Sequence, residues 1–399
     1  MTRIVIVSAR RTPFGRFRGG LSPLSPVELG TIAAKAALDG LDCQRIDSVI
    51  VGNVLAAGHG MNIARQIGIQ AGLPISVPAY TVNMMCASGL QAVLLAVQAI
   101  RAGDAQAVLC GGTESMSQSG LLIPRPARDA SPSLDVVVDT LMRDGLVDTF
   151  SHRHMAETVE QLSREAAISR SLQDEFAVRS QQLYAVASAE GRYRDEIVPV
   201  GNVTVDEHPR PATTLQSLSS LKPAFEGTIT AGNASGVNDG AAMLVVANAD
   251  FAVQQGWQPL AEWQAGEVVG CEPQRMGLGP VHAARALCSK LATSLDQFDT
   301  IEINEAFAAQ SLACMGQLQL ASDDRRVNSD GGAIAIGHPI GTSGARLVTH
   351  LAWKMARGES QRGLATLCVG GGMGIAAALK RTATVVAMLV VVLSIAVNA

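Results

Sequence analysis

Aromatic residues are scarce in this chain of 399 residues, since Phe, Trp and Tyr together make up 4% of it. Charge is also low, with 17% charged residues and a formal net charge of −4. The core therefore has to be filled mainly by Ala, Val, Leu and Ile, and hydrophobic residues reach 48% of the chain. Because it has no basic stripe, the sequence does not fit a nucleic-acid-binding protein, and any anionic ligand has to be held by local groups.

Patterns typical of metal sites and disulfide frameworks are missing as well. The seven cysteines are odd in number, and no two of them have C-x-x-C spacing. His152 and His154 form the only H-x-H pair, which is more typical of solvent-facing or capping histidines than of a metal site. We therefore predict no metal site and no disulfide framework, and a reducing, cytoplasmic compartment is the simplest interpretation.

Neither end of the chain carries a strong targeting pattern. The N-terminal stretch MTRIVIVSARRTPFG has no long apolar core behind a basic region, so RIVIV is interpreted as a buried first strand. The C-terminal stretch 383–399, ATVVAMLVVVLSIAVNA, is apolar but shorter than the roughly 20 residues of a membrane span. A terminal strand packed on the body and a non-native extension are favoured over a membrane anchor.

Two distant segments share one pattern. Ser88-Gly89 opens a helix-like stretch that leads to AVLCGG, and Ser343-Gly344 opens another that leads to LATLCVGGG. In both copies a strand follows the helix and reaches a cysteine and glycines, at Cys110 in the first copy. This similarity predicts two duplicated halves of alternating strands and helices that pack together.

The chain between the two copies has a different composition. It is richer in charge, Pro and Ser, as in LIPRPARDASPS and DEHPRPATTLQS, and long excursions from a compact core usually bind a ligand or a partner. We therefore predict four parts: a first half from residues 1–117 and 238–258, an inserted loop domain over 118–237, a second half over 259–381, and an apolar extension over 382–399.

Three reactive side chains lie in turns that contain glycine. Cys86 in NMMCASG precedes a helix start, whose dipole would lower the pKa of the thiol, although its apolar neighbours fit an inert buried cysteine equally well. His338 in GHPIG is held by Gly and Pro, which favours a functional histidine over a surface one. Cys368 ends an apolar strand just before Gly370, in a glycine run whose N–H groups can bind an oxyanion.

A fourth polar side chain follows another apolar strand. Asn304 in EINEAFAAQ can hold a water molecule or polarise a carbonyl group, but a helix cap is an equally good interpretation of the local sequence. A nucleophilic thiol, an imidazole base and a second thiol are the groups needed to make or break a carbon–carbon bond next to a thioester. Local sequence alone does not pair these groups with one another.

Taken in order, the segments NMMCASG, GNASGVNDGAA, NEAFA, NSDGGAIAIGHPIGTSGAR and CVGGGMG resemble the thiolase family, and the resemblance covers residues 3–380. It implies an α/β thiolase fold, with the duplicated halves in a layered αβαβα core. It places the acyl-accepting nucleophile on Cys86, its base on His338, and proton exchange with the α-carbon of the substrate on Cys368. It also implies two oxyanion holes, one from His338 with a water held by Asn304, and one from the N–H groups of Cys86 and Gly370.

The resemblance implies that coenzyme A is a substrate or product and that no cofactor is needed. Family positions that contact the pantetheine, the nucleotide or the acyl group match His154, Met155, Ser235, Ala231, Arg210, Ser217, Phe225, Leu146, Met276 and Phe307. The His-Met pair and the NASG form look most like enzymes that handle short acyl groups. Two of these side chains, Met155 and Met276, should shorten the acyl pocket.

Acetyl-CoA C-acetyltransferase activity, the reversible condensation of two acetyl-CoA to acetoacetyl-CoA, is therefore the expected function. The alternatives are a 3-ketoacyl-CoA thiolase of broader chain length, a non-catalytic acyl-CoA-binding scaffold, and a decarboxylating ketoacyl-synthase type of enzyme, against which Cys368 argues. The resemblance also implies a homo-oligomer, a tetramer or a dimer. One departure is Asp330 in NSDGG, where Asn is common, and we expect it to perturb the loop before His338 only modestly.

Overall fold

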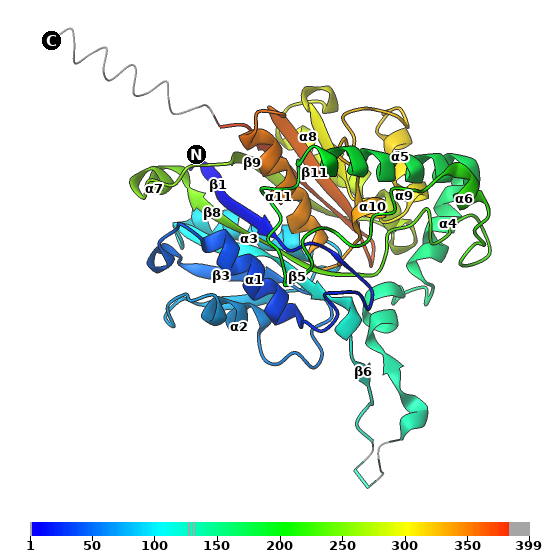
Figure 1. The fold of residues 1–399 in the computed structure, drawn as a ribbon, viewed down its shortest axis with the longest axis horizontal. Coiled ribbons are helices and arrows are strands. Elements are labelled where there is room, and N and C mark those ends of the chain that lie inside the picture. The colour runs from blue at the N-terminus through cyan, green and yellow to red at the C-terminus, as the bar shows by residue number, and fades with distance from the viewer. Residues whose placement is uncertain (1, 127, 130, 132, 383–399) are drawn as a thin grey trace, which may run out of the picture.

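A mixed sheet of ten strands forms the centre of the computed structural model, which describes residues 2–382 except 127, 130 and 132 (Figure 1). The apolar stretch 383–399 lies outside the described residues, so the structure does not decide between a terminal strand, a non-native extension and a membrane anchor there. The strands are β1 (Ile4–Arg11), β2 (Gly15–Arg16), β3 (Ser48–Gly52), β4 (Ala79–Val82), β5 (Ala107–Ser115), β8 (Asn238–Asn248), β9 (Ala261–Gly270), β10 (Thr300–Ile303), β11 (Arg362–Val369) and β12 (Met373–Lys380).

The strand order repeats within the sheet. The first half runs β1-β8-β5-β3 and the second runs β9-β12-β11-β10, with β4 added at the edge beyond β3. In each half the first two pairings are antiparallel and the third is parallel. The predicted duplication is therefore confirmed in the topology. The sequence did not indicate that β1 and β9 join the two half-sheets, through residues 4–6 and 261–263.

Helices cover and separate the half-sheets, which gives the predicted five layers. Helices α1 (Pro26–Leu38) and α2 (Ile63–Gln70) pack on the outer face of the first half. Helices α8 (Gly279–Lys290) and α9 (Ala308–Gln317) pack on the outer face of the second half. The middle layer consists of α3 (Ser88–Ala102) and α11 (Ser343–Ala356), which share one buried cluster with strands of both halves.

The two Ser-Gly dipeptides allow α3 and α11 to meet closely. A methyl group at Gly89 would lie 3.0 Å from Cβ of Ala345, and one at Gly344 would lie 2.7 Å from Cβ of Leu90. Each glycine therefore leaves room for the other helix, which is the physical reason for the repeated motif. The apolar segment Met85–Ala102 has the length and composition of a membrane span, but 56% of it is buried inside the protein, as in a core helix.

The inserted region forms helices beside the second half and a projecting arm (Figure 1). Its helices are α4 (Met155–Glu165), α5 (Arg170–Ala189) and α6 (Leu215–Ser219). The arm carries the short strands β6 (Leu121–Leu122) and β7 (Val138–Asp139), and a π-helical turn, Leu141–Leu146, leads back to the body. The remaining elements are the helices α7 (Ala249–Gln254) and α10 (Ala333–Ile336) and the 3-10 turns Cys43–Arg45, Met116–Gln118, Leu134–Val136, Pro273–Leu278 and Leu295–Gln297.

A buried chain of alternating charges connects the three parts of the protein. Arg11 on β1 donates to Glu196 of the inserted region at 2.6 Å. His350 on α11 bridges Glu196 and Asp330, at 2.9 and 3.0 Å. Burial opposes the charge on this imidazole, but the two carboxylates outweigh it and raise the pKa of His350 to about 9.

Asp330, which stands where Asn is common in the family, is the carboxylate at the end of this series of buried charges. Its carboxylate also accepts from Lys354 at 2.7 Å and from Arg192 at 2.5 Å, and burial leaves it fully covered. An asparagine would offer one acceptor oxygen to these three cationic partners, whereas the carboxylate offers two oxygens and a charge. The aspartate is therefore part of the network that holds the loop before His338.

Asp330→Asn is expected to lower the free energy of unfolding by about 3–5 kcal/mol, because it leaves buried cations without their shared anion. Urea unfolding at a fixed protein concentration measures the loss. Asp324→Asn is a matched control, since Asp324 accepts from Arg326 at 2.7 Å on the surface of the same segment and such a pair contributes about 1 kcal/mol or less. Equal losses in the two variants would contradict the assignment.

Candidate active site

One cavity of about 210 Å³ brings together most of the residues that the sequence identifies. Its walls come from both halves and from the inserted region. Twelve of the fifteen predicted site residues line it: Cys86, Leu146, His154, Met155, Phe225, Ala231, Ser235, Met276, Phe307, His338, Cys368 and Gly370. The site therefore lies where the two halves meet.

Cys86 lies in a tight turn, two residues before the first residue of α3. Met85 takes a left-handed backbone with φ 48°, a conformation that is unfavourable for a side chain with a Cβ atom. Ser88 fixes the turn, because its hydroxyl accepts from Met84 N at 2.9 Å and donates to Met85 O at 2.7 Å. The serine of the Ser-Gly motif therefore holds the loop that carries the thiol.

The pKa of Cys86 changes in the direction opposite to the one expected. Burial raises the pKa of the thiol to about 11, and the N–H groups of Gly370 and of Cys86 itself only partly offset this. The expectation of a lowered pKa was wrong because loss of hydration outweighs the helix N-terminus. The thiol is therefore neutral at rest and needs a base.

His338 supplies an imidazole with one free nitrogen. Its Nδ1 lies 2.5 Å from Ser343 Oγ, which donates to Pro339 O at 3.0 Å. In this arrangement Nδ1–H donates to the serine and Nε2 keeps its lone pair. Nε2 is buried and has no partner in the part of the chain that the structure describes. Burial, together with the charge of Arg346, lowers the pKa of His338 to about 4, so the ring is neutral and able to accept a proton.

The loop before His338 is fixed by a residue that sequence reasoning missed. Asn238 accepts from His338 N at 3.0 Å and donates to Gly15 O at 2.9 Å. Gly337, with φ 109°, leaves the space that the asparagine fills. The signal was present in GVNDGAA, where a polar residue opens an apolar run and is fully buried in the structure.

Asn304 lies behind His338 rather than in the cavity wall. Its Nδ2 is 3.5 Å from His338 Nδ1, and its Oδ1 has no partner among the described residues. The helix-cap interpretation was wrong, because α9 begins at Ala308 with Phe307 as its N-cap residue. The amide is therefore buried beside the imidazole.

Cys368 and Gly370 face Cys86 from the end of β11. Burial, followed by the nearby thiols of Cys86 and Cys314, raises the pKa of Cys368 well above its usual value. The backbone N–H groups of Gly370 and Cys86 both favour the thiolate form of Cys86 and so lower its pKa against the effect of burial. A methyl group at Gly370 would lie 3.7 Å from Met155 Sδ.

The residues predicted to contact coenzyme A fall into two groups. His154 lines the cavity, caps α4 by accepting from Ala156 N at 3.1 Å, and lies 4.9 Å from the ring of Phe225. Ser235 N donates to Ala306 O at 3.0 Å, which ties the NASG and NEAF segments together. In contrast, Arg210 and Ser217 are exposed and lie outside the cavity wall.

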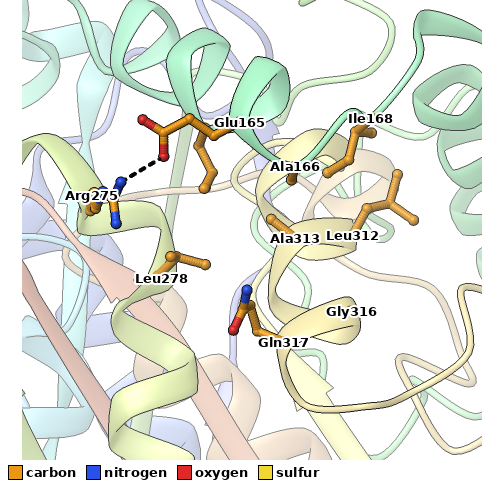
Figure 2. A pocket seen from close by; sticks show the side chains of 10 residues that line it. Glu165, Ala166, Ile168, Arg275, Leu278, Leu312, Ala313, Gly316 and Gln317 are labelled. Atoms are coloured by element: carbon orange, nitrogen blue, oxygen red, sulfur yellow. Dashed lines mark ion pairs between the residues drawn. The ribbon is translucent and has the colours of Figure 1, made fainter.

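A second hollow, of about 340 Å³, lies among α4, α9 and the 3-10 turn Pro273–Leu278 (Figure 2). Glu165 and Arg275 form an ion pair of 3.0 Å across it. Neither cysteine nor histidine lines it, so it lacks the groups that the predicted chemistry requires.

Comparisons with known proteins agree with this geometry. The family models of the thiolase N-terminal and C-terminal domains match residues 4–250 and 257–381. An acetyl-CoA acetyltransferase of Cupriavidus necator is 47% identical over 395 residues, covering 96% of this chain and 100% of the relative. A probable acetyl-CoA acetyltransferase of Escherichia coli is 44% identical over 393 residues, covering 96% and 100%.

Solved structures show the same fold. The human mitochondrial 3-ketoacyl-CoA thiolase in complex with CoA has a TM-score of 0.91 and 40% identity, covering 96% of this chain and 98% of that chain. The acetyl-CoA acetyltransferase of Bacillus anthracis has a TM-score of 0.91 and 38% identity, covering 96% and 99%. With both domain models matched and relatives aligned over nearly their whole length, this chain belongs to the thiolase family.

Proposed function

We propose that this chain is an acetyl-CoA C-acetyltransferase, which condenses two acetyl-CoA to acetoacetyl-CoA and CoA, or cleaves acetoacetyl-CoA in reverse. The observation that carries the proposal is the convergence of Cys86, His338 and Cys368 on one cavity, with the N–H group of Gly370 directed at the Cys86 sulfur. The relatives named acetyl-CoA acetyltransferase support the choice of substrate. Release of acetyl-CoA from acetoacetyl-CoA and CoA by the purified protein is the direct test.

In cleavage, the first step forms an acyl-enzyme. His338 Nε2 takes the Cys86 proton, and the thiolate adds to the C3 carbonyl of acetoacetyl-CoA. The negative oxygen accepts hydrogen bonds from the N–H groups of Cys86 and Gly370. The C2–C3 bond then breaks, its electrons leave as the acetyl-CoA enolate, and the Cys368 thiol protonates C2. The other acetyl group stays on Cys86.

The second step returns every proton. The incoming CoA thiol gives its proton to the Cys368 thiolate and attacks the acetyl-Cys86 carbonyl. A second acetyl-CoA leaves, and the Cys86 thiolate recovers its proton from the imidazolium of His338. For the second oxyanion hole, we assign His338 together with a water held by Asn304 to bind the thioester oxygen of the enolate.

The pH dependence follows from the lowered pKa of His338. The neutral imidazole is the form that accepts a proton, and it predominates above pH 4 because the pKa lies at about 4. The acid limb of kcat/KM should therefore appear near pH 4, with a flat region above about pH 5, rather than near the ordinary value of 6.5. Initial rates after a brief exposure to each pH measure this, and recovery of activity at pH 7 controls for unfolding. An acid limb near pH 6.5 would contradict the assignment.

Chain length separates the proposed activity from a broader 3-ketoacyl-CoA thiolase. The cavity of about 210 Å³ is lined by Met155, Met276 and Phe307, whose bulk favours short acyl groups, although methionine can move aside. Initial rates with a series of 3-ketoacyl-CoA substrates decide between the two. A maximum at acetoacetyl-CoA supports the proposal, whereas a flat profile or a maximum at medium chains favours the alternative.

The exposed Arg210 and Ser217 are assigned to the nucleotide end of coenzyme A. Both lie on the inserted region outside the cavity, and a guanidinium suits phosphate recognition there. The residues around Ser235, Ala231 and Leu146 line the cavity and are assigned to the pantetheine.

We also assign a homo-oligomeric state, a tetramer or a dimer. Strand β4 ends the sheet order, and Tyr80 on it is 43% exposed. On the arm, Leu121 and Leu134 are 72% and 78% exposed. Unpaired strand edges and exposed apolar side chains are typical of association surfaces. Light scattering at micromolar concentration tests this, and a monomer would contradict it.

The cytoplasm is the assigned location, because all seven cysteines are free thiols, as is usual in a reducing compartment. Membrane fractionation of the full chain beside a chain that ends at Arg381 tests both this location and the apolar extension. Equal soluble fractions support the assignment, and loss of membrane association on truncation would overturn it.

A further inference from the structure

Glu114 is a fully buried carboxylate near the reaction site that the steps above do not use. It lies towards the end of β5 and is 0% exposed. Its side chain does not line the cavity, yet its charge is close enough to act on the thiol of Cys86. None of the described cationic side chains forms an ion pair with it. A buried carboxylate without a cation is costly unless it is fully hydrogen bonded.

Four neutral donors satisfy this carboxylate. Oε1 accepts from Asn53 Nδ2 at 2.9 Å and from Leu55 N at 3.1 Å. Oε2 accepts from Val54 N at 3.1 Å and from Gly341 N at 2.9 Å. The first three donors belong to the segment that follows β3 in the first half. The fourth belongs to the second half, in the same GHPIG loop as His338.

The contact between Glu114 and Gly341 is tight. A methyl group at Gly341 would lie 2.6 Å from Glu114 Oε2, and one at Gly112 would lie 2.1 Å from Gly341 O. Glycine at these positions therefore lets the loop rest directly on β5. Ile340, the preceding residue, packs in one cluster with Val54 and Leu55, against which Cys86 also packs. The carboxylate thus joins the surroundings of the thiol to the loop of the base.

The other anchors of this loop come from a different strand. Asn238 on β8 holds His338 N, and Thr342 Oγ1 donates to Gly240 O on the same strand at 2.8 Å. Glu114 adds the anchor on β5, on the side of Cys86. Because the loop is held from two strands, its distance from the thiol is fixed in two directions.

We infer that Glu114 is a positioning residue that holds the Gly337–Thr342 loop, and with it His338, at the distance from Cys86 that proton transfer requires. The inference rests on the proposed thiolase reaction, in which His338 takes the Cys86 proton. A displacement of about 1 Å between reacting groups can slow a reaction about 10²-fold. Glu114 therefore acts through His338 and not on the substrate.

Glu114→Ala and Glu114→Gln test this role together. Glu114→Ala is expected to lower kcat about 10²-fold, with the KM for CoA nearly unchanged, because the assigned coenzyme A contacts lie elsewhere. Iodoacetamide should also alkylate Cys86 more slowly, by a similar factor. Glu114→Gln keeps an oxygen for Val54 N and Gly341 N, and it gives up only the acceptor of Asn53 Nδ2 and Leu55 N. It should retain kcat within about tenfold.

Asp47→Ala is the matched control at the opposite end of β5. The carboxylate of Asp47 accepts from Gln106 N at 2.6 Å and from Ala107 N at 3.0 Å, far along the strand from the cavity. This variant should lose stability without losing kcat per folded molecule. If Glu114→Ala likewise lowers only the unfolding midpoint and leaves kcat and alkylation unchanged, the positioning role is overturned.

A second comparison covers the case in which Glu114→Ala does not fold. Glu114→Asp keeps the charge but is one methylene shorter, so it draws back from Gly341. It should have a lower kcat than Glu114→Gln, and equal values or the reverse order would overturn the inference. Alkylation of Cys86 is measured without turnover. If the wild-type protein shows no thiolysis, the proposed function fails, while slower alkylation in the variants still supports the positioning role.

Discussion

Replacing Cys86 by alanine is expected to abolish cleavage of acetoacetyl-CoA, with a loss in kcat of about 10⁴-fold or more. The reason is that the variant has no atom to accept the acyl group, and neither Cys368 nor His338 is placed to substitute for it. Acetyl-CoA consumption and formation in a coupled assay measure the rate. Binding of CoA should persist, because the other cavity-lining side chains are intact.

Cys110→Ala is the matched control for this substitution. Cys110 lies on β5, is fully buried in the cluster formed around α3 and α11, and does not line the cavity. Its removal should cost some stability and leave kcat per folded molecule unchanged. A Cys86→Ala protein that keeps more than about 1% of the wild-type rate contradicts the covalent route.

Cys368→Ser should separate the two parts of the reaction. A hydroxyl is a far weaker acid than a thiol, so it exchanges a proton with the α-carbon poorly, and cleavage and condensation should fall about 10³-fold. Exchange of the acetyl group between acetyl-CoA and labelled CoA breaks no C–H or C–C bond. The His338 imidazolium, which holds the Cys86 proton, can protonate the departing CoA thiolate in place of Cys368, so exchange should stay within about tenfold of wild type. Measuring both rates on the same protein shows the separation.

Cys314→Ser is the control for this second substitution. Its thiol is buried near Cys368 and donates to Gly277 O at 3.1 Å, but it does not line the cavity. A hydroxyl can make the same hydrogen bond, so both rates should remain. If Cys368→Ser loses exchange as fully as cleavage, or keeps both, the proton-exchange role is wrong.

The main features of the fold could be predicted from repeated local patterns. The two Ser-Gly dipeptides mark the starts of α3 and α11, and the duplication they indicate appears in the order and direction of the strands. One detail differed. β5 continues to Ser115, past Cys110 where the first-copy strand was expected to end, because Gly111 and Gly112 stay extended and pair with β8.

The electrostatics of the site could not be predicted in the same way. The helix N-terminus beside Cys86 is visible in the sequence, but the burial that raises its pKa depends on residues from the second half. Glu114 meets Gly341 across 227 positions of sequence, and Asn238 meets His338 across 100. Contacts of this kind arise from packing of the two halves and leave no local pattern.

The assigned coenzyme A contacts also fall into residues that line the cavity and residues that do not. Those in short, distinctive segments, such as His154 and Ser235, line the cavity. Arg210 and Ser217 lie in a segment rich in Pro, Ser and Thr that runs over the surface. The cavity does not reach these two residues.

The most direct test of the central claim is to find where the acetyl group resides during the reaction. The protein is mixed with acetyl-CoA alone, quenched in acid and digested, and its peptides are analysed by mass spectrometry. The account predicts an acetyl group on the peptide that contains Cys86, and its loss when CoA is added before the quench. An acetyl group on the Cys368 peptide instead, or turnover of acetoacetyl-CoA with no acetylated cysteine, would contradict it.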